Sequence, residues 1–319
     1  KINILSDGSL LLYAYQQSEV YMQILNQYKN GNVTTTLYDD GTRERVIDGN
    51  TPTFLFPENI DVKITNYCDM DKVCTYCHEQ SNKSGVHGNL NMLLNQLNQL
   101  PAGIELAIGG GSTTSHPQLT QFLQSAKQMG FICNLTVNQL HLKQDDELIN
   151  NLITSDLIKG IGISYRNEYN KYLEKYASYE HSVIHLIAGI DDYKVINSLY
   201  QLGFRKFLVL GYKTFGNGTE YFDNNSKEVL DNISLWKMKI AQFFNRDIII
   251  SFDNLAISPL EINRFLSDTE WNLFYQGDDF TCSMSIAAVE HKYAPASRCH
   301  IRVSFGTSSL LVSFSSCDQ

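Results

Sequence analysis

The sequence predicts an α/β protein built around a parallel sheet, and three observations predict it. Strand-like apolar runs alternate with amphipathic helical segments from about residue 59 onward. Six or seven such βα units follow one another, a series that forms a parallel sheet, either open or curled into a partial barrel. The chain has 319 residues, of which 43% are hydrophobic and 18% charged, so it can bury a sizeable hydrophobic core. We expect one domain of catalytic size with β-rich additions at each end.

The N-terminal addition, residues 1–58, reads as small antiparallel structure. The β-prone run 33–38 is followed by Asp39-Asp40-Gly41-Thr42 and then by a second run over 43–47. An Asp-Gly pair between two such runs is typical of a β-hairpin.

The βα series begins with a strand at 60–65 and a leucine-rich helix that ends before Pro101. Later strands are expected at 104–108, 131–137, 160–165, 183–190, 205–211 and 247–252. Helices are expected near 117–129, 144–155, 168–177, 191–202 and 226–244. Pro117 suits a first helical turn, Gly130 and Gly203 suit the position after a helix, and Ser226 suits an N-cap. Residues 299–319 do not fit this series. Ligands of such sheets bind at the carboxyl ends of the strands.

Charge and hydropathy narrow the class of protein. The chain has 25 Lys and Arg against 34 Asp and Glu, a net charge of −9, which disfavours bulk nucleic-acid binding. No stretch approaches the length of an apolar membrane span, and the first residues lack the pattern of a signal peptide. We expect a cytoplasmic protein without membrane association.

Three of the seven cysteines lie close together after the first βα strand. Cys68, Cys74 and Cys77 form a C-x5-C-x2-C pattern. Thiolates are the usual ligands of iron–sulfur clusters and also bind zinc. A structural zinc site needs a fourth ligand, and the nearby His78 is directly adjacent to Cys77. Three thiols without an obvious fourth ligand favour a [4Fe–4S] cluster with one open iron. A zinc-binding module with three cysteines and one histidine, and merely buried thiols, remain alternatives.

With these residues the sequence resembles the radical S-adenosylmethionine (SAM) superfamily over roughly residues 59–255. That family has three cysteines after its first strand, with an aromatic residue before the third, which here is Tyr76. Its glycine-rich segment resembles Gly109-Gly110-Gly111-Ser112, followed by His116-Pro117. Two features depart from the family pattern: the first cysteine interval is five residues instead of three, and Ser112 replaces the usual Glu.

The resemblance implies a fold, an activity and a set of site residues. The fold would be a partial (β/α)6 TIM-like barrel over 59–255, with an N-terminal β-hairpin region (1–58) and a C-terminal β-rich extension (256–319). The enzyme would use a [4Fe–4S] cluster to cleave SAM to methionine and a 5′-deoxyadenosyl radical, which abstracts hydrogen from a substrate. The implied cluster ligands, counted as both metal-binding and catalytic, are Cys68, Cys74 and Cys77. The implied SAM-binding residues are Tyr76, Gly109, Gly110, Gly111, Ser112, Asn138, Ser164 and Arg166.

The partners implied are a substrate at the barrel mouth and an electron donor such as flavodoxin or ferredoxin. The substrate is a small molecule, a nucleotide or a peptide, and His78, Glu79, Tyr212, Lys213, Asp253 and Asn254 are candidates to line its site. His185 is expected to be a core or lining histidine rather than a ligand. Cys282, Cys299 and Cys317 are widely spaced in the sequence and do not form the close cysteine pairs that would indicate a second iron–sulfur cluster. A SAM-binding relative that has lost the chemistry is the remaining alternative.

Overall fold

The chain forms two compact units, Lys1–Phe56 and Pro57–Gln319. The computed structural model describes residues 2–4, 10–12, 23–39, 42–49, 53–70, 74–166, 171–244, 246–268, 271, 281–285, 301–306 and 309–310. Within this part of the chain, no helix is both long and apolar enough to cross a membrane.

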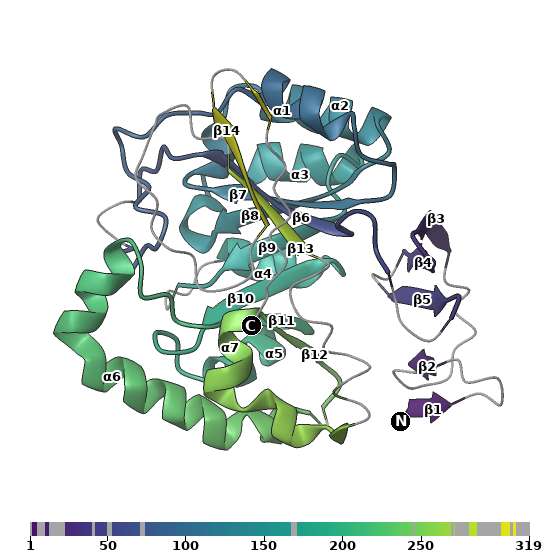
Figure 1. The fold of residues 1–319 in the computed structure, drawn as a ribbon. Coiled ribbons are helices and arrows are strands. Elements are labelled where there is room, and N and C mark those ends of the chain that lie inside the picture. Colours follow the sequence, from purple (N-terminus) through teal and green to yellow (C-terminus); the bar gives the residue numbers. More distant parts are fainter. Residues whose placement is uncertain are drawn as a thin grey trace. The chain divides into compact units, whose positions relative to one another are not determined.

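Unit 1 consists of antiparallel strands (Figure 1). They are β1 (Ile2–Ile4), β2 (Leu10–Leu12), β3 (Ile24–Asn30), β4 (Val33–Tyr38) and β5 (Arg43–Ile47). β1 pairs with β2, and β4 pairs with β3 on one side and β5 on the other. The predicted hairpin between 33–38 and 43–47 is therefore confirmed. β3 was not predicted, because its less exposed positions include Asn26 and Asn30, so the sequence lacks an apolar alternation there.

The parallel sheet of unit 2 has seven strands that follow one another in chain order. They are β6 (Asn59–Thr65), β7 (Glu105–Gly110), β8 (Ile132–Asn138), β9 (Gly160–Ser164), β10 (Ser182–Ile187), β11 (Lys206–Leu210) and β12 (Ile249–Phe252). Every neighbouring pair is parallel. The α/β class and the strand series are confirmed. Within the described residues the sheet does not close on itself.

The C-terminal residues extend this sheet at its β6 side. β13 (Thr281–Ser285) pairs parallel to β6, β14 (Ile301–Gly306) pairs parallel to β13, and β15 (Ser309–Leu310) is antiparallel to β14. Of the three late cysteines, Cys282 belongs to β13, whereas Cys299 and Cys317 lie outside the described residues.

The helices stand between the strands, as the alternating pattern predicts (Figure 1). They are α1 (Leu90–Leu97), α2 (Leu119–Gln128), α3 (Asp146–Thr154), α4 (Lys171–Ala177), α5 (Val195–Leu202), α6 (Asn217–Lys239) and α7 (Asn254–Leu260). Short 3₁₀ turns are η1 (Thr113–Ser115), η2 (Gln139–His141), η3 (Ile240–Phe243) and η4 (Ile262–Phe265).

The glycine residues predict two helix ends correctly, whereas the proline and the serine predict two helix starts at the wrong positions. Gly130 and Gly203 follow α2 and α5 with φ of 86° and 113°, a region that glycine enters without strain. Pro117 lies before α2, which begins at Leu119. Ser226 is not an N-cap, because α6 begins at Asn217. Its cap-like signal coincides with a kink, since Asn225 just before it has non-helical φ and ψ of −132° and 25°.

The sheet of unit 2 has one buried, largely apolar face and a second face of mixed character. In β8, Cys133, Leu135 and Val137 are buried, while the polar side chains between them are partly exposed. In β10 and β11 the less buried positions also include valine, isoleucine and leucine. His185 of β10 stands on that second face, as its register partner Ser164 of β9 does.

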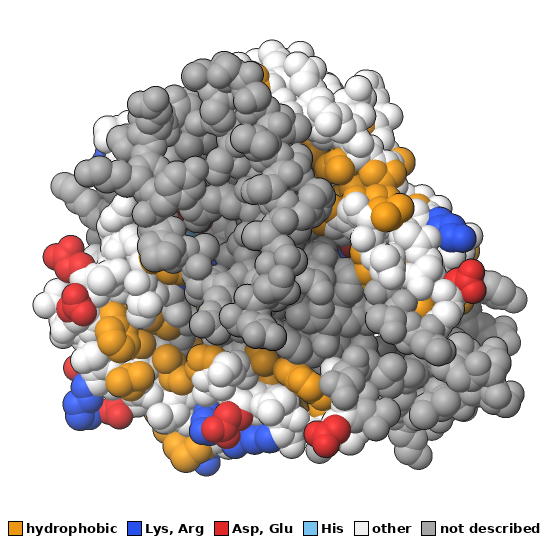
Figure 2. Space-filling view, viewed as in Figure 1, with side chains coloured by type: hydrophobic (Ala, Val, Ile, Leu, Met, Phe, Trp, Pro, Cys, Tyr) orange, Lys and Arg blue, Asp and Glu red, His pale blue; other side chains and the backbone are white. Residues whose placement is uncertain are grey.

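Exposed apolar side chains gather along α6 and the turn that follows it (Figure 2). They include Leu230, Leu235, Met238 and Phe244. Acidic and basic side chains stand next to one another on the same edge, as in the ion pair between Lys227 and Asp231.

Candidate functional site

The cysteine loop, residues 66–82, leaves β6 at the carboxyl end of the strand. Its two ends are joined, because the Cys68 N–H donates to the Asn82 carbonyl at 2.9 Å and the Asn82 N–H donates to the Asn66 carbonyl at 3.1 Å. A turn brings the Cys77 N–H to the Cys74 carbonyl at 2.9 Å. Cys68 and Cys74 are buried and Cys77 is partly exposed. Residues 71–73 lie outside the described part of the loop.

The glycine segment, residues 109–112, packs its backbone directly against this loop. The Ser112 N–H donates to the Tyr67 carbonyl at 2.7 Å, and the Gly111 N–H donates to the Thr65 carbonyl at 2.9 Å. A Cβ atom on Gly111 would lie 2.0 Å from the Tyr67 oxygen, so the approach requires glycine here. The segment therefore fixes the backbone on which Cys68 stands.

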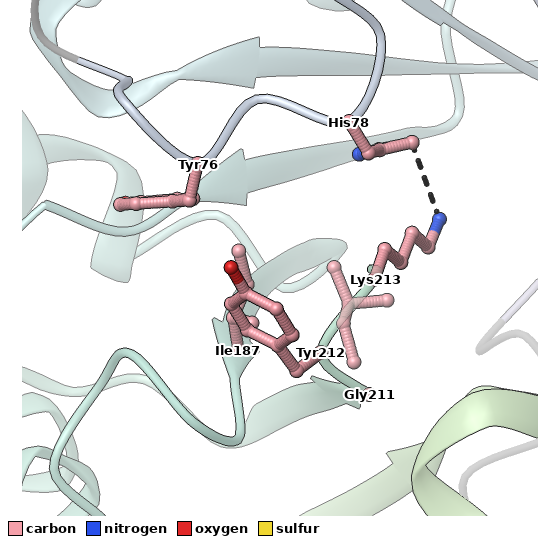
Figure 3. Close-up of a pocket in the computed structure, with 7 residues that line it drawn as sticks. Tyr76, His78, Ile187, Gly211, Tyr212 and Lys213 are labelled. Atoms are coloured by element: carbon pink, nitrogen blue, oxygen red, sulfur yellow. Dashed lines mark hydrogen bonds between the residues drawn. The ribbon is translucent and has the colours of Figure 1, made fainter. Parts of the chain in front are cut away.

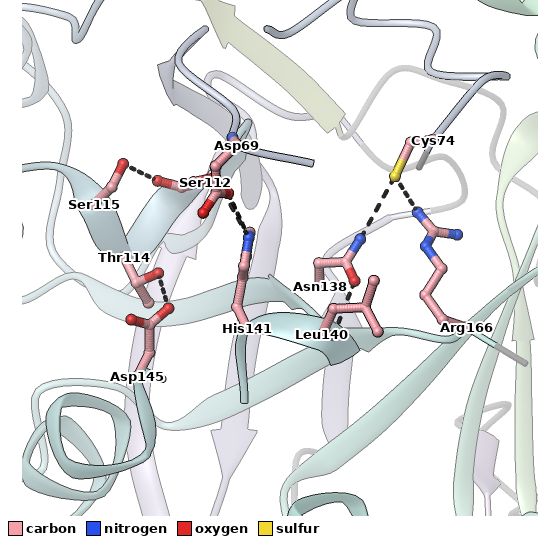
Figure 4. Close-up of polar contacts among 10 residues, drawn as sticks. All are labelled: Asp69, Cys74, Ser112, Thr114, Ser115, Asn138, Leu140, His141, Asp145 and Arg166. Carbon is pink, nitrogen blue, oxygen red and sulfur yellow. Dashed lines mark hydrogen bonds and ion pairs between the residues drawn. The ribbon is translucent and has the colours of Figure 1, made fainter. Parts of the chain in front are cut away.

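Cys74 is held by two side chains from neighbouring strand ends (Figure 4). Arg166, just after β9, donates from Nη2 to Cys74 Sγ at 2.9 Å, and the Nδ2 of Asn138 lies 3.7 Å from the same sulfur. Burial raises the pKa of the Cys74 thiol, and the Arg166 cation opposes that rise. Arg166 also donates from Nη1 to the Tyr76 hydroxyl, with its guanidinium 5.3 Å from the centre of the Tyr76 ring.

A second polar cluster surrounds Asp69 (Figure 4). The Ser112 hydroxyl donates to Asp69 Oδ1 at 2.5 Å and accepts the Asp69 N–H at 3.2 Å. His141 Nε2 lies 2.8 Å from the same carboxylate oxygen. Burial acts to raise the pKa of Asp69, but the contacts from Ser112 and His141 outweigh it and hold that pKa below its usual value. Asp69 and His141 were not among the predicted site residues.

A small cavity lies between the cysteine loop and the ends of β10 and β11 (Figure 3). Its lining is mostly apolar or aromatic and consists of Tyr76, His78, Ile187, Leu210, Gly211, Tyr212 and Lys213. The Tyr212 hydroxyl donates to the Gly218 carbonyl at 2.7 Å, and this hydrogen bond holds the Tyr212 ring in place. The predicted lining residues Tyr212, Lys213 and His78 are thus brought together at one cavity.

A chain of polar and charged side chains leads from this cavity to β6. Lys213 Nζ lies 3.3 Å from His78 Nε2, which lies 3.2 Å from Glu79 Oε1, and Glu79 in turn pairs with Lys63. Burial lowers the pKa of His78. Burial acts to raise the pKa of Glu79, yet its contacts with His78 and Lys63 place that pKa well below the usual range, so Glu79 is ionised.

The start of α6 closes over the cysteine loop. The Asn217 N–H donates to the Cys77 carbonyl at 3.1 Å. A Cβ atom on Gly216 would lie 2.2 Å from the His78 carbonyl oxygen, so the two backbones are in direct contact. Farther along the helix, the ring of Tyr221 meets that of Tyr76 edge-on at 5.6 Å. These contacts explain why α6 begins earlier than its apolar pattern predicts.

Asp191 is a buried acid behind Arg166 that the sequence analysis also missed. It accepts the Ile187 N–H at 2.7 Å, and its own carbonyl accepts Trp236 Nε1–H at 2.7 Å. Burial raises the pKa of its carboxyl group to about 6, although the Ile187 contact and the Arg166 cation act in the opposite direction.

The remaining predicted residues have other positions. Ser164 pairs in register with Asn138 and with His185, and no described side chain bonds to its hydroxyl. Gly109 and Gly110 end β7, in register with Lys63 and Thr65. Asp253 caps α7 and accepts the Gly211 N–H at 2.8 Å, and Asn254 begins that helix. Asp253 therefore has a structural role in the strand-to-helix turn.

The thiols fit a cluster by their chemistry but are not gathered around a metal position. Among the described residues, no group of three or more His, Cys, Asp and Glu side chains is arranged to hold a metal ion. Cys68 is contacted by Ser112, and Cys74 by Arg166 and Asn138. Charge on Cys74 or Cys77 would raise the pKa of Cys68, so the three thiols lie near enough to repel one another when ionised. Three mutually repelling thiolates on one loop suit an iron–sulfur cluster.

Comparison with known proteins finds solved structures of similar fold but no relative by sequence. No family model matches the sequence, and no curated protein matches it. SuiB from Streptococcus suis, bound to precursor peptide SuiA, matches with a TM-score of 0.52 and 13% identity over 73% of this chain and 58% of SuiB. SuiB bound to S-adenosylmethionine matches with a TM-score of 0.49 and 14% identity over 73% of this chain and 59% of SuiB. SuiB alone matches with a TM-score of 0.48 and 16% identity over the same shares of the two chains. This chain spans about six tenths of the length of SuiB, with which it shares its fold.

Proposed function

We propose that this chain is a radical SAM enzyme. The observation that carries the proposal is the packing of a three-cysteine loop, through Gly111 and Ser112, against the carboxyl end of a parallel sheet. The shared fold with SuiB, a protein that has also been crystallised with SAM, supports it. The strand ends next to the loop carry the polar side chains expected around a bound cofactor.

Cys68, Cys74 and Cys77 would hold a [4Fe–4S] cluster as thiolates. When bound, the cluster would supply the electron that cleaves SAM to methionine and a 5′-deoxyadenosyl group capable of abstracting hydrogen from a substrate. Burial raises the pKa of Cys74, and the Arg166 cation directed at its sulfur opposes that rise, so the arginine stabilises the thiolate against the effect of burial. The buried positions of Cys68 and Cys74 keep water away from the same region.

The SAM-binding residues divide between the two moieties of the cofactor. Arg166 Nε is buried and has no hydrogen-bond partner among the described residues, which leaves it a donor for the methionine carboxylate. The cavity between Tyr76, Leu210 and Tyr212 would take the adenine ring, since flat apolar surfaces bind its faces. Asn138 and Ser164, which are register partners, would bond to the ribose hydroxyls. Gly109, Gly110, Gly111 and Ser112 would contribute backbone groups next to the methionine moiety.

A peptide is the substrate class that the comparison suggests, because SuiB has been crystallised with a precursor peptide. A small molecule or a nucleotide is the alternative, and an electron donor such as flavodoxin or ferredoxin would reduce the cluster.

The test is purification without oxygen, reconstitution with iron and sulfide, and assay of 5′-deoxyadenosine in the presence of dithionite. We expect about four irons per chain and SAM cleavage in the wild type. Cys68→Ala, Cys74→Ala and Cys77→Ala should each lose both. The matched control is Cys133→Ala, because Cys133 is buried in β8 with a pKa raised by burial to about 12 and is not a candidate ligand. Stoichiometric zinc without iron, or full iron in any of the three loop variants, would contradict the proposal.

A further inference from the structure

Lys213 brings a positive charge to the cavity beside the cysteine loop. It follows β11 at the carboxyl end of that strand, where ligands of parallel sheets bind. Its Nζ atom lies 3.3 Å from His78 Nε2. Figure 3 shows the Lys213 side chain turned toward His78, with Tyr76 on another side of the cavity. An adenine ring in the cavity is neutral, so it would not balance the charge of this lysine.

His78 does not balance the charge of Lys213 either. The same ring nitrogen, Nε2, also lies 3.2 Å from Glu79 Oε1. One nitrogen cannot donate to Glu79 and accept from Lys213 at the same time. An imidazole that accepts there is neutral, and one that donates there leaves the ammonium group without an acceptor. Lys213 therefore gains no counter-charge from this contact, whichever ring nitrogen of His78 carries the proton.

The carboxylate of Glu79 is already paired with another cation. Its second oxygen, Oε2, contacts Lys63 Nζ. The charges of that pair cancel, so Lys63, Glu79 and Lys213 together carry one positive charge. Within the part of the chain that the structure describes, no carboxylate forms an ion pair with Lys213. A net charge of one matches a carboxylate, whereas a phosphate group near its second ionisation would leave an excess of negative charge.

The segment that carries Lys213 is held in place on both sides. A Cβ atom on Gly218 would lie 2.1 Å from the Lys213 carbonyl oxygen, so the start of α6 packs directly against the backbone of Lys213. The ring of Phe215 meets the ring of His78 edge-on at 5.4 Å, which fixes the imidazole that the ammonium group faces. A charge that is held in position before a ligand arrives binds that ligand at a smaller cost in ordering.

We infer that Lys213 binds a carboxylate group of the substrate at this cavity. The inference rests on the proposed function, because it requires a substrate to bind beside SAM. Arg166 is the partner proposed for the SAM carboxylate, so Lys213 is left for a second acid. For a peptide substrate, that acid is an Asp or Glu side chain or the carboxyl terminus, and Lys213 determines the specificity for it.

Acetylation of Lys213 measures this binding in the reconstituted protein, with and without saturating SAM. The reagent is the neutral N-hydroxysuccinimidyl acetate, and mass spectrometry gives the acetylation rate of each lysine. The probes are N-acetylglutamate amide, its neutral counterpart N-acetylglutamine amide, and N-acetylglycinate, which represents a carboxyl terminus. We expect a carboxylate probe to halve the rate at Lys213 at a concentration about tenfold or more below that of the neutral probe, as a charge-assisted bond implies. The more effective of the two carboxylates identifies the source of the acid.

Lys83 is the internal control, because it is exposed and does not line the cavity. At constant ionic strength, no probe should slow its acetylation. Charge reversal in Lys213→Glu provides a second measurement, with circular dichroism to check the fold. By saturation-transfer NMR, this variant should lose the carboxylate probe and gain N-acetylethylenediamine, a cation that the wild type does not bind.

Three results would overturn the inference. Equal protection by the charged and the neutral probes would show that Lys213 recognises no carboxylate, and stronger protection by inorganic phosphate would assign a different anion. Shielding of Lys213 by SAM beyond that by 5′-methylthioadenosine, which lacks the carboxylate, would assign the lysine to the cofactor. A failure of the proposed function is seen separately, because the wild type would then hold no iron and cleave no SAM, whereas acetylation requires neither.

Discussion

The guanidinium of Arg166 donates through Nη2 to the sulfur of Cys74 at 2.9 Å, across 92 positions of the sequence. This cation lies directly on one of the three clustered cysteines, where it opposes the rise that burial gives to the pKa of that thiol. The resemblance implies Arg166 only as a SAM-binding residue, and its contact with the Cys74 thiol was not expected.

Replacing Arg166 with alanine should raise the pKa of Cys74, because burial then acts without the opposing cation. In the metal-free protein, the pH profile of Cys74 modification by methyl methanethiosulfonate, followed by mass spectrometry, should move to higher pH. The pH profile of Arg166→Lys should lie between the profiles of the wild type and of Arg166→Ala. Cys133 serves as the internal reference, and an unshifted Cys74 profile would show that the arginine contact has no effect on the thiol.

Gly111 and Gly109 give a matched pair for the backbone contact beneath Cys68. Gly111→Ala places a Cβ atom 2.0 Å from the Tyr67 carbonyl oxygen, so the cysteine loop must move, and we expect a loss of about 2 kcal/mol or more in unfolding free energy. Gly109→Ala meets only Thr136, at 3.8 Å, and should change stability by less than about 1 kcal/mol. Urea denaturation measures both, and equal effects would refute the collision argument.

Asp191→Asn should stabilise the protein above pH 6 and have little effect near pH 4. Burial raises the pKa of Asp191 from 3.8 to about 6, so ionisation costs the folded state free energy that the unfolded state does not lose. The wild type therefore loses stability as pH rises through this window, by roughly 3 kcal/mol for a shift of that size. The asparagine variant lacks this loss. Urea titrations from pH 4.5 to 8 should show the difference growing with pH, and a constant difference would disprove the assignment.

Gly162 and His185 should be energetically coupled across neighbouring strands. A Cβ atom on Gly162 would lie 2.5 Å from the His185 ring, so Gly162→Ala should cost about 1 to 3 kcal/mol. In a His185→Ala background the obstacle is gone, and the same change should cost at least about 1 kcal/mol less. A double-mutant cycle by denaturation provides the value, and additive effects would mean that the ring moves aside freely.

The sheet could be predicted because each strand carries its own signal. The apolar runs of β6 to β12 and glycines such as Gly130 and Gly203 are local features of the sequence. The start of α6 was missed because Asn217 and Gly218 have no apolar periodicity, and backbone contacts with the cysteine loop hold them instead. Local pattern cannot reveal a helix turn that a distant segment stabilises.

Within the candidate site, motif and position predicted which residues converge but not which atoms meet. Tyr76, Asn138 and Arg166 come together around Cys74, as strand ends of one sheet must. His141 gave no signal, because a single histidine after a strand has no spacing to interpret. The sequence did not predict that Asp69 contacts Ser112, because the two residues are 43 positions apart and only the folded sheet brings them together.

The cysteine loop is covered by residues that the ribosome makes long after it. Cys77 is synthesised well before Asn217, whose N–H binds its carbonyl, and at a synthesis rate of roughly 5–20 residues per second the interval is about 7 to 28 s. During that time the three thiols belong to a growing chain that lacks α6, and for the first part of it the chain lacks Arg166 as well. The cysteines therefore meet the solvent of the cell before they meet their partners, and the completion of α6 sets the moment at which the site closes.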